Sequence, residues 1–378
     1  MGARKKIALT YFYSENWIAG AYYVANMLKA VDKLPDAEKP HFVMLITNYD
    51  GMDILREANY PYMSIVNVNA NTEPAVKKYL RKIDRKLTGT DHLLAHALKG
   101  VEHVFEGGEQ FSQIPNHYYW VHDFQECRLP DFFTKEEAAK RSALPKKVAG
   151  MKDVTLILSS YDALNDFNTF FPGHVCDISI LRFASALPDT SDIDIETQKK
   201  NFDVNSPYFI CSNQFWQHKN HRVVLEAIRL LKDKNLDYQV LFTGKNFDHR
   251  NPRYFESMQQ FVTTNNLDKY IRFLGFIDRK IQLKLAEHAM SYIQPSLFEG
   301  WSTTVEDAKC LNQHIILSNI PVHIEQLDYN VSFFDPHQPQ DLADKMEKVI
   351  REGVVREHRD YGENIKAFGR DIVSMFAK

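Results

Sequence analysis

The sequence has few cysteines, and they lie far apart. The four are Cys127, Cys176, Cys211 and Cys310, with no CxxC pair among them. Structural zinc sites and disulfide frameworks need closer or denser cysteines than these. We therefore expect reduced, buried thiols, as in a cytosolic protein.

Long apolar runs and an excess charge of one sign are also missing. No segment approaches the roughly 20 consecutive apolar residues of a membrane-spanning helix. The apolar run near the start is interrupted by Ser14, Glu15 and Asn16, too early for a secretory signal. The formal net charge of −3 excludes a polycation that binds nucleic acid through bulk charge. We therefore expect a cytoplasmic protein with no nucleic-acid partner.

Several nucleotide- and metal-binding motifs are absent as well. The sequence contains neither GxGxxG nor a Walker pattern, and the first strand-to-helix loop supplies a single glycine, Gly20. It has no HExxH motif, no GxSxG motif and no DxD pair that we assign to a metal. The motifs thus predict no metal site.

What the sequence does have is a regular alternation of apolar runs and amphipathic stretches. Its 378 residues suggest two domains. In the first half a helix is expected at Gly20–Val31, and strands are expected at Lys6–Phe12, His41–Ile46, Val101–Phe105, His117–Val121 and Val154–Leu158. In the second half, strands are expected at Tyr208–Cys211, Gln239–Thr243, Ile271–Leu274, Met290–Gln294 and His314–Ser318. The helices expected there are Val223–Lys232, Tyr254–Asn265, Ile281–His288 and Thr304–Cys310. This alternation favours an α/β fold with parallel sheets covered on both faces.

A segment without lasting periodicity divides the two halves. It is rich in Asp, Ser and Thr and predicts a linker at residues 187–206 between domains at 1–186 and 207–355. A final helical stretch occupies residues 356–378. Two facing doubly wound domains would bind a ligand in the cleft at the carboxyl ends of their strands.

The segment 294–326 has the richest chemistry. A strand is expected to end at Gln294, and a helix to begin near Ser302–Thr304, after a loop with Glu299 and Gly300. The unpaired N–H groups of a helix start suit a phosphate. A loop acid and a helix acid eight positions apart, Glu299 and Asp307, could hold two sugar rings by their hydroxyls. Alternatively, the acids of the first helical turn only complement the helix dipole.

Two other strand-end loops carry candidate side chains. Lys219 precedes a helix, where a cation would stabilise a leaving diphosphate, although a lone lysine is usually a solvated surface residue. His122 follows a strand and could orient a substrate hydroxyl or share a proton, or be an ordinary hydrogen-bonded histidine. The adjacent Asp123 suits a capping or orienting role better than that of a base.

At this point several segments resemble a known family. Three segments are similar to segments of the family-4 glycosyltransferases, which are retaining enzymes of the GT-B fold. They are IRFLGFIDRKIQLKLAEHAMSYIQPSLFEGWSTTVEDAK, SNQFWQHKNH and DFQECRLPDFFTKEE. The subgroup resembled acts in bacterial surface polysaccharide and lipid-linked glycan assembly. The resemblance covers nearly the whole chain and is strongest between residues 208 and 335. It implies an N-terminal acceptor domain, a C-terminal donor domain and a last helix that crosses back.

The resemblance also implies roles for single residues. The E-x(7)-E pair of the family falls on Glu299, which would hold the donor sugar, and on Asp307, which would hold the ribose. The shorter Asp307 leaves open whether Glu306 shares that role. The Arg–Lys pair on the diphosphate falls on Gln214 and Lys219, so the arginine is missing. The implied catalytic residues are Glu299, Lys219 and His122, and the implied donor-binding residues are Gly20, Gln214, Lys245, Ile277, Gly300, Trp301, Ser302, Thr303, Thr304, Glu306 and Asp307.

The implied reaction moves a hexose from a nucleotide-sugar to a hydroxyl of a glycan or lipid-linked saccharide, with retained configuration. It requires no metal and no cofactor. Two alternatives stay open: a nucleotide-sugar 2-epimerase of the same fold, and a non-catalytic copy that binds sugar nucleotides or glycans. Product formation would separate an enzyme from a binder.

A basic helix is expected at residues 75–86. Its positive side chains include Lys77, Lys78, Arg81 and Lys82. They could rest on an anionic membrane, at about 1 kcal/mol per charge, which would suit a lipid-linked acceptor at the inner face of the membrane. The alternative is an ordinary solvated helix face.

Overall fold

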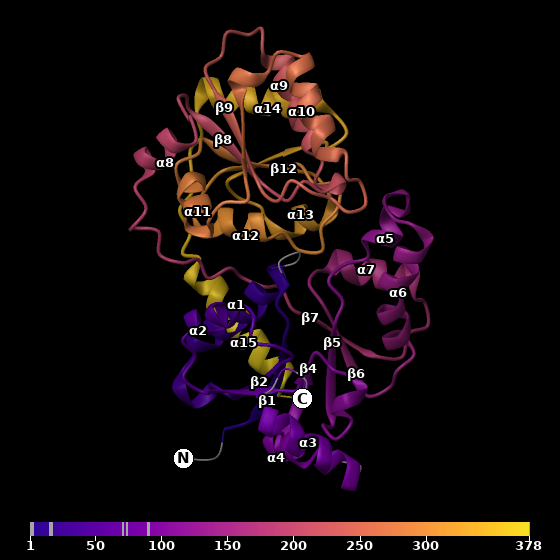
Figure 1. Ribbon diagram of the computed structural model, residues 1–378. Helices are drawn as coiled ribbons and strands as arrows, with labels where there is room; N and C mark the ends of the chain where they lie inside the picture. The colour runs from indigo at the N-terminus through magenta and orange to yellow at the C-terminus, as the bar shows by residue number, and fades with distance from the viewer. Residues whose placement is uncertain (1–3, 15–17, 70–71, 73–74, 89–90, 378) are drawn as a thin grey trace.

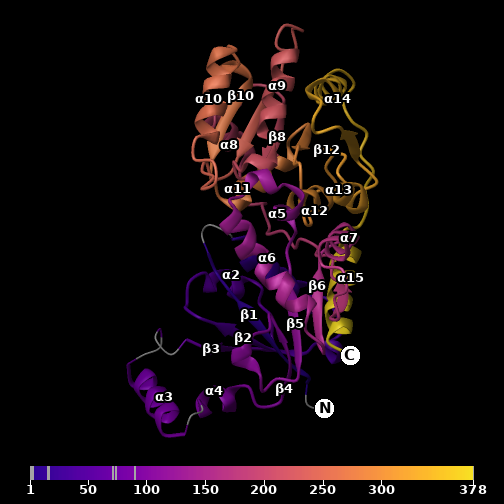
Figure 2. The same ribbon diagram turned by 90° about the vertical axis from the view of Figure 1, so that its right-hand side faces the viewer.

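The computed structural model describes residues 4–14, 18–69, 72, 75–88 and 91–377. Within these residues the chain forms two parallel sheets, one of seven strands and one of six, each flanked by helices (Figure 1). Each sheet is the centre of one domain, and the two domains lie one above the other (Figure 2). The predicted α/β class with two Rossmann-like domains is confirmed.

The N-terminal sheet has the order β3-β2-β1-β4-β5-β6-β7. Its strands are β1 (Lys6–Tyr11), β2 (His41–Ile46), β3 (Met63–Asn67), β4 (Val101–Phe105), β5 (Asn116–Trp120), β6 (Val154–Leu158) and β7 (Asp177–Ile180). The helices around it are α1 (Ala19–Asp32), α2 (Met52–Glu57), α3 (Ala75–Thr88), α4 (His92–Ala97), α5 (Gln125–Arg128), α6 (Lys135–Ala149) and α7 (Tyr161–Phe170).

The C-terminal sheet has the order β10-β9-β8-β11-β12-β13. Its strands are β8 (Tyr208–Ser212), β9 (Gln239–Thr243), β10 (Ile271–Gly275), β11 (Ser291–Gln294), β12 (Ile315–Ser318) and β13 (Val331–Phe334). Its helices are α9 (His221–Leu231), α10 (Tyr254–Thr264), α11 (Arg279–Glu287), α12 (Thr303–Cys310), α13 (Pro321–Gln326) and α14 (Pro339–Glu352). In both sheets the strand order reverses at the first strand of the domain, beside β4 and beside β11.

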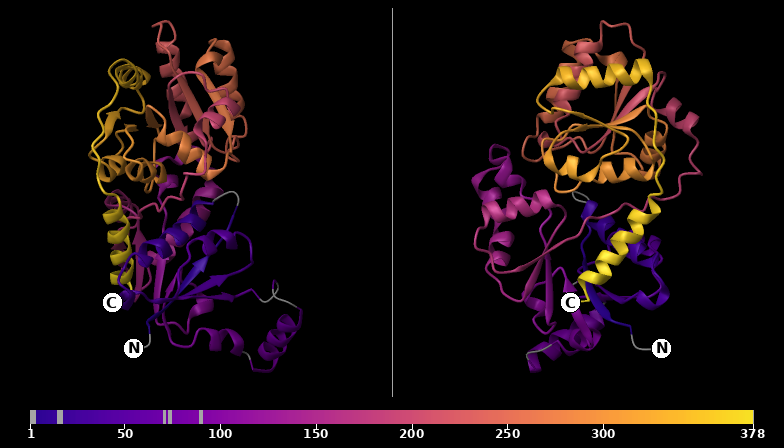
Figure 3. Two further views of the ribbon diagram at one scale, coloured as in Figure 1. Left: turned by 90° about the vertical axis from the view of Figure 1, so that its left-hand side faces the viewer. Right: turned by 180° about the vertical axis from the view of Figure 1, so that it is seen from behind.

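The last helix, α15 (Gly362–Met375), packs on the N-terminal domain, against α1 (Figure 3). Phe368 and Ile372 of this helix belong to the buried core of that domain. A Cβ at Gly369 would lie 2.5 Å from the carbonyl oxygen of Ala30, so glycine permits the close approach of the two helices. The end of the chain therefore ties the two domains together.

Several elements of the structure differ from the sequence-based expectation. The strands β3, β7 and β13 were not anticipated, and all three lie at sheet edges. The predicted linker contains a short helix, α8 (Ile195–Asn201), where a loop was expected. The Asp194 side chain caps this helix by accepting a hydrogen bond from the Thr197 N–H at 2.8 Å.

Candidate active site

The site lies where the strand order of the C-terminal sheet reverses. Lys219 follows β8 in a short 3-10 turn, Gln217–Lys219, and Glu299 follows the neighbouring strand β11. Lys219 Nζ donates to Glu299 Oε1 at 2.6 Å, and both side chains are largely buried, with 17% and 10% of their surface exposed. The crevice outside such a reversal point is where open α/β sheets bind ligands.

Neighbouring polar groups fix the Glu299 carboxylate. Its Oε1 accepts hydrogen bonds from Ser296 Oγ at 2.7 Å and from Gln294 Nε2 at 2.8 Å. The Asn220 side-chain amide donates hydrogen bonds to the carbonyl oxygens of Pro295 and Pro336, and these bonds hold the loops after β11 and β13 in place. The acid is thus positioned before any ligand binds.

The helix α12 begins directly after this loop. Ser302 is its N-cap, and the Ser302 hydroxyl accepts a hydrogen bond from the Val305 N–H. The α12 helix lies on the side of the C-terminal domain that faces the N-terminal domain (Figure 1). The first N–H groups of the helix and its partial positive charge can hold an anion next to Lys219.

The N-terminal domain meets this loop through the strand-end segment of His122. A Cβ at Gly300 would lie 2.1 Å from the His122 carbonyl oxygen, so only glycine allows the two loops to approach this closely. The His122 ring packs edge-on against the Trp120 ring, with 4.1 Å between the ring centroids. The surrounding protein desolvates the imidazole and lowers its pKa to about 4, so the ring is neutral at pH 7.

A cavity of about 150 Å³ lies between the two domains at Glu299. Its other lining residues are Arg128, Leu129, Asp162, Leu297, Phe298, Ile320, Pro321 and Val322. Arg128 forms ion pairs with Asp162 at 3.1 Å and with Asp166 at 2.5 Å. The cavity at Glu299 is therefore also lined by the ion-paired side chains of Arg128 and Asp162 of the N-terminal domain.

Glu306 and Asp307, adjacent in the first turns of α12, have different surroundings. The Glu306 carboxylate accepts hydrogen bonds from Lys309 and Gln326, both at 2.9 Å, and from the Tyr361 hydroxyl before α15. Asp307 instead pairs with Arg279 Nη2 at 2.6 Å. The contacts of Glu306 bind the C-terminal segment to α12. Asp307 instead forms an ion pair with Arg279, a residue that the sequence analysis did not single out.

Most of the remaining residues of the donor list lie near the same strand ends of the C-terminal sheet. The Phe215 N–H donates to the Lys245 carbonyl oxygen at 3.0 Å, which joins the loops of Gln214 and Lys245. Thr304 Oγ1 donates to the Ser212 carbonyl oxygen at 3.2 Å. Ile277 precedes α11 at the end of β10, whereas Gly20 lies on α1 of the opposite domain. The functional roles of these residues stay predictions.

Two sets of contacts that the sequence analysis did not anticipate, made by Glu325 and by Trp301, hold the domains together beside the site. The Glu325 carboxylate accepts hydrogen bonds from the N–H groups of Tyr161 and Asp162 at the start of α7, and it pairs with Arg182 at 2.5 Å. Trp301 Nε1 donates to the Phe183 carbonyl oxygen at 3.1 Å. No sequence signal pointed to this clasp, because its partners lie more than a hundred positions apart.

The basic helix α3 lies far from this site, at the end of the N-terminal domain that faces away from the C-terminal domain (Figures 1 and 2). Lys77, Lys78 and Lys82 are exposed, as a surface patch requires. The prediction for Arg81 is wrong: its side chain is 2% exposed, pairs with Asp91 at 2.7 Å and donates to the Asn67 carbonyl oxygen. Arg81 anchors the helix to the domain.

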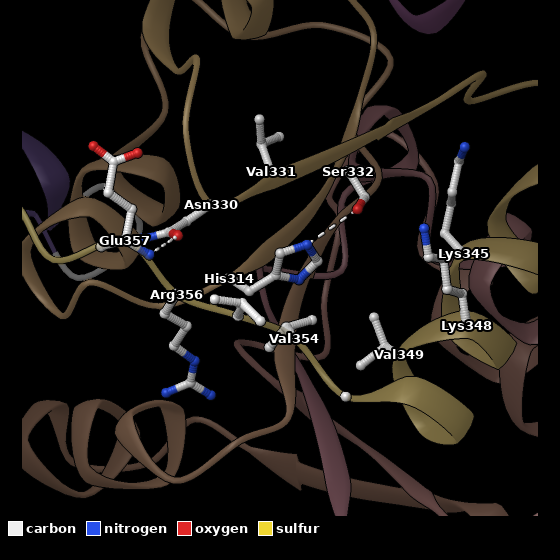
Figure 4. Close-up of a pocket in the computed structure, with 12 residues that line it drawn as sticks. His314, Asn330, Val331, Ser332, Lys345, Lys348, Val349, Val354, Arg356 and Glu357 are labelled. Carbon is white, nitrogen blue, oxygen red and sulfur yellow. Dashed lines mark hydrogen bonds between the residues drawn. The ribbon is translucent and has the colours of Figure 1, made fainter.

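A larger cavity of about 450 Å³ lies elsewhere in the C-terminal domain. It is formed by β13, the end of α14 and the segment that follows α14, around His314 and its hydrogen bond to Ser332 (Figure 4). None of the residues predicted to bind the donor lines it. The size of this cavity therefore does not make it the candidate active site.

Two classes of feature are not found within the described residues. No group of three or more His, Cys, Asp or Glu side chains there is placed to hold a metal ion. No helix in the described part of the chain is both long and apolar enough to span a membrane.

Comparisons with known proteins agree with this geometry. Residues 192–368 match the family of glycosyl transferases group 1. Anabaena HepE, solved with UDP and glucose, is similar over 99% of this chain and 100% of its own, with a TM-score of 0.66 and 12% identity. The sucrose-phosphate synthase of Thermosynechococcus elongatus is similar over 98% and 94% of the two chains, with a TM-score of 0.63 and 15% identity. No curated protein sequence matches the chain.

At such identities the solved structures establish the fold. Their similarity extends over nearly the whole length of both chains. The family match covers residues 192–368 of the C-terminal half, and the likeness of the complete structures agrees with the two-domain GT-B fold that the sequence predicted.

Proposed function

We propose that this chain is a retaining glycosyltransferase of the family-4 type. It would move a hexose from a nucleotide-sugar to a hydroxyl of a glycan or lipid-linked saccharide, in the synthesis of surface polysaccharide or glycoconjugate. The observation that carries the proposal is the Lys219–Glu299 pair at the reversal point of the sheet, beside the start of α12 and opposite His122.

Each member of the pair suits a different part of the donor. Lys219 and the N–H groups at the start of α12 would neutralise the diphosphate as it leaves. Glu299 would accept hydrogen bonds from the hydroxyls of the sugar. HepE, which shares the fold, was solved with UDP and with UDP-glucose, and this supports a nucleotide-sugar as the donor.

The reaction would proceed without a protein nucleophile. The bond between the sugar and the diphosphate breaks, the acceptor hydroxyl attacks the oxocarbenium-like sugar from the same face, and the leaving phosphate takes the hydroxyl proton. A neutral His122 imidazole can exchange hydrogen bonds with the sugar or the acceptor. The proposal requires no metal and no cofactor.

The acceptor would reach the N-terminal domain from the inner surface of a membrane. The α3 helix exposes Val76, Tyr79, Leu80 and Ile83, with 75%, 65%, 53% and 37% of their surfaces accessible. These positions follow the i, i+3, i+4, i+7 spacing of one helix face, and lysines flank them. Such a helix suits the surface of an anionic bilayer, with its apolar face among the acyl chains. The protein would thus act as a cytoplasmic, peripheral membrane enzyme.

Product formation tests the proposal. The full chain is incubated with UDP-, GDP-, dTDP- and ADP-sugars in EDTA, and thermal shift and slow donor hydrolysis are recorded. We expect one nucleotide to stabilise the fold and one of its sugars to be released with its anomeric configuration retained, as read by NMR. Binding without turnover in the presence of glycan or lipid-linked acceptors would indicate a non-catalytic binder, and release of an epimerised sugar would indicate a 2-epimerase.

A further inference from the structure

An arginine of the C-terminal domain, Arg250, reaches the N-terminal domain beside the candidate site. It lies in the loop between β9 and α10, and 10% of its side chain is exposed. Its Nη1 donates a hydrogen bond to Gln125 Oε1 of the N-terminal domain at 3.1 Å. Its guanidinium also lies over the Phe133 ring of that domain, 4.8 Å from the ring centroid. The Arg250 side chain therefore crosses the boundary between the domains.

The same side chain is tied to the turn that carries Lys219. Asp248 Oδ1 accepts hydrogen bonds from the Arg250 N–H at 3.0 Å and from its Nε at 3.2 Å, and Asp248 Oδ2 accepts one from the Gln217 N–H at 3.1 Å. Arg250 Nη2 lies 3.4 Å from Nδ1 of His218, the residue before Lys219. Burial holds the pKa of His218 well below its ordinary value, so the ring is neutral and Nδ1 can accept this hydrogen bond. Asp248 and His218 thus fix Arg250 to this turn.

On the other side, the contacts of Arg250 lead to the segment that carries His122. Gln125 begins α5, three positions after His122, and its side chain is buried. The Asp123 carboxylate accepts a hydrogen bond from the Gln125 N–H at 3.1 Å, which fixes the loop between β5 and α5. Arg250 therefore connects the loop that positions Lys219 with the loop that positions His122.

We propose that Arg250 is a positioning residue that latches the two domains together around the bound donor. The latch keeps the turn of Lys219 opposite the segment of His122, whereas the Glu325 clasp joins α13 to α7. A planar guanidinium suits this task, because its five N–H donors bind several acceptors at fixed angles while its face packs on an aromatic ring. Without the latch, a nucleotide would still bind to the C-terminal domain but would no longer be held against His122.

This inference rests on the proposed function, and its test is designed to separate the two. Arg250→Ala and Arg250→Lys are compared with the wild type and with Arg222→Ala. Arg222 is the matched control, because it pairs with Glu226 at 2.7 Å and lies over the Phe261 ring at 3.8 Å, all within the C-terminal domain. Thermal unfolding verifies the fold of each variant. Gln125→Ala, which removes only the acceptor in the N-terminal domain, replaces Arg250→Ala if that variant does not fold.

Three measurements are made on the full chain. Small-angle X-ray scattering without ligand reports the separation of the domains, and calorimetry measures the affinity for UDP, GDP, dTDP and ADP. Hydrolysis of the corresponding nucleotide-sugars gives kcat. We expect Arg250→Ala to increase the radius of gyration and to lower kcat by at least about ten-fold, while the affinity for the nucleoside diphosphate changes by less than about three-fold.

The other variants refine the expectation. Arg250→Lys should stay close to Arg250→Ala, because an ammonium cannot bind acceptors of both domains in a fixed geometry. Gln125→Ala should also lower kcat, and it should add little to the loss in Arg250→Ala, because both variants break the same latch. Arg222→Ala should behave as the wild type in all three measurements.

Three results would overturn the inference while leaving the donor site intact. They are an unchanged radius of gyration in folded Arg250→Ala, an unchanged kcat in that variant, and an equal loss of kcat in Arg222→Ala. A fall in diphosphate affinity as large as the fall in kcat would also overturn it, because Arg250 would then contact the donor itself. A wild type that neither binds a nucleotide nor hydrolyses a donor would overturn the proposed function, whereas the scattering comparison would still decide whether Arg250 latches the domains.

Discussion

Glu299 and Glu306 are close in the sequence, yet their surroundings suit different tasks. Glu299 lies on the interdomain cavity with Lys219 as its charged partner. Glu306 is enclosed by Lys309, Gln326 and Tyr361, which occupy its carboxylate within the protein. The first acid is therefore a candidate for ligand binding, and the second mainly holds the fold together.

Exchange of each acid for its amide should separate the two roles. We expect Glu299→Gln to reduce kcat/KM for transfer by at least about 100-fold, because the amide cannot match a charged acceptor of sugar hydroxyls. Glu306→Gln should mainly lower the free energy of unfolding, by roughly 1–3 kcal/mol, because it disturbs a buried hydrogen-bond network. Steady-state kinetics and urea unfolding measure both effects. Near-normal transfer by Glu299→Gln would remove Glu299 from the donor site.

The α3 helix is inverted compared with an ordinary surface helix. Its charged Arg81 is buried, whereas Val76, Tyr79, Leu80 and Ile83 are exposed. The buried ion pair of Arg81 with Asp91 fixes which face the helix turns outward. The exposed apolar stripe is more specific evidence for a lipid surface than the lysines alone, because apolar stripes are seldom left in water.

Vesicle binding tests this reading of α3. Replacement of Lys77, Lys78 and Lys82 by glutamine should weaken binding to anionic vesicles by about 100-fold, since each charge contributes about 1 kcal/mol near the surface. Tyr79→Ser with Leu80→Ser should weaken binding by removing the inserted apolar groups. Exchange of the exposed Lys234, which pairs with Glu347 in the C-terminal domain, serves as the control. Equal sedimentation of all variants with the vesicles would leave α3 a solvated face.

The interior strands and the strand-end loops could be predicted from the sequence, because parallel strands buried on both faces are continuous apolar runs. The edge strands β3, β7 and β13 could not, since exposed positions interrupt that pattern, as Ile65 does in β3 with 42% of its surface accessible, whereas the edge strand β10 was predicted. Arg279 was missed because its partner Asp307 is 28 positions away and only the fold brings them together. Arg81 was misplaced because a count of charges does not reveal which helix face is buried.

At the scale of the whole molecule, burial in the folded protein keeps several histidine side chains neutral. Burial lowers the pKa of His221 to about 3 and of His314 and His323 to about 4, and it lowers the pKa of His218 as well. In the unfolded chain a histidine titrates near pH 6.5. As the pH falls from about 6.5 to 4, the unfolded chain therefore takes up protons that the folded protein does not.

The free energy of unfolding should therefore decrease between pH 7 and pH 5. Glu106 and Asp166, whose pKa values burial raises to about 7 and about 6, act in the opposite direction but are fewer. Urea denaturation at the two pH values measures the change. His221→Phe should flatten the dependence, because a phenyl ring can keep the stacking on Phe215 without titrating. A fold that becomes more stable on acidification would contradict this account of the buried histidines.

Several contacts join the domains around the candidate site, and three of them enclose it. These are the Glu325 clasp on α7, the close contact of Gly300 with His122, and the return of α15 to the N-terminal domain. Together they place the Lys219–Glu299 pair between two domains. The central claim is that Lys219 of this pair receives the diphosphate of a nucleotide-sugar, and that Glu299 receives its sugar.

The most direct test compares nucleoside and nucleoside diphosphate binding by calorimetry, in the wild type and in Lys219→Ala. The wild type and Lys219→Ala should differ only in their affinity for the nucleoside diphosphate, because Lys219 is proposed to contact the diphosphate group alone. We predict that Lys219→Ala loses at least about ten-fold in affinity for the diphosphate, as expected for a charge-assisted contact, and binds the nucleoside as the wild type does. Equal diphosphate affinity in the two proteins would contradict the account.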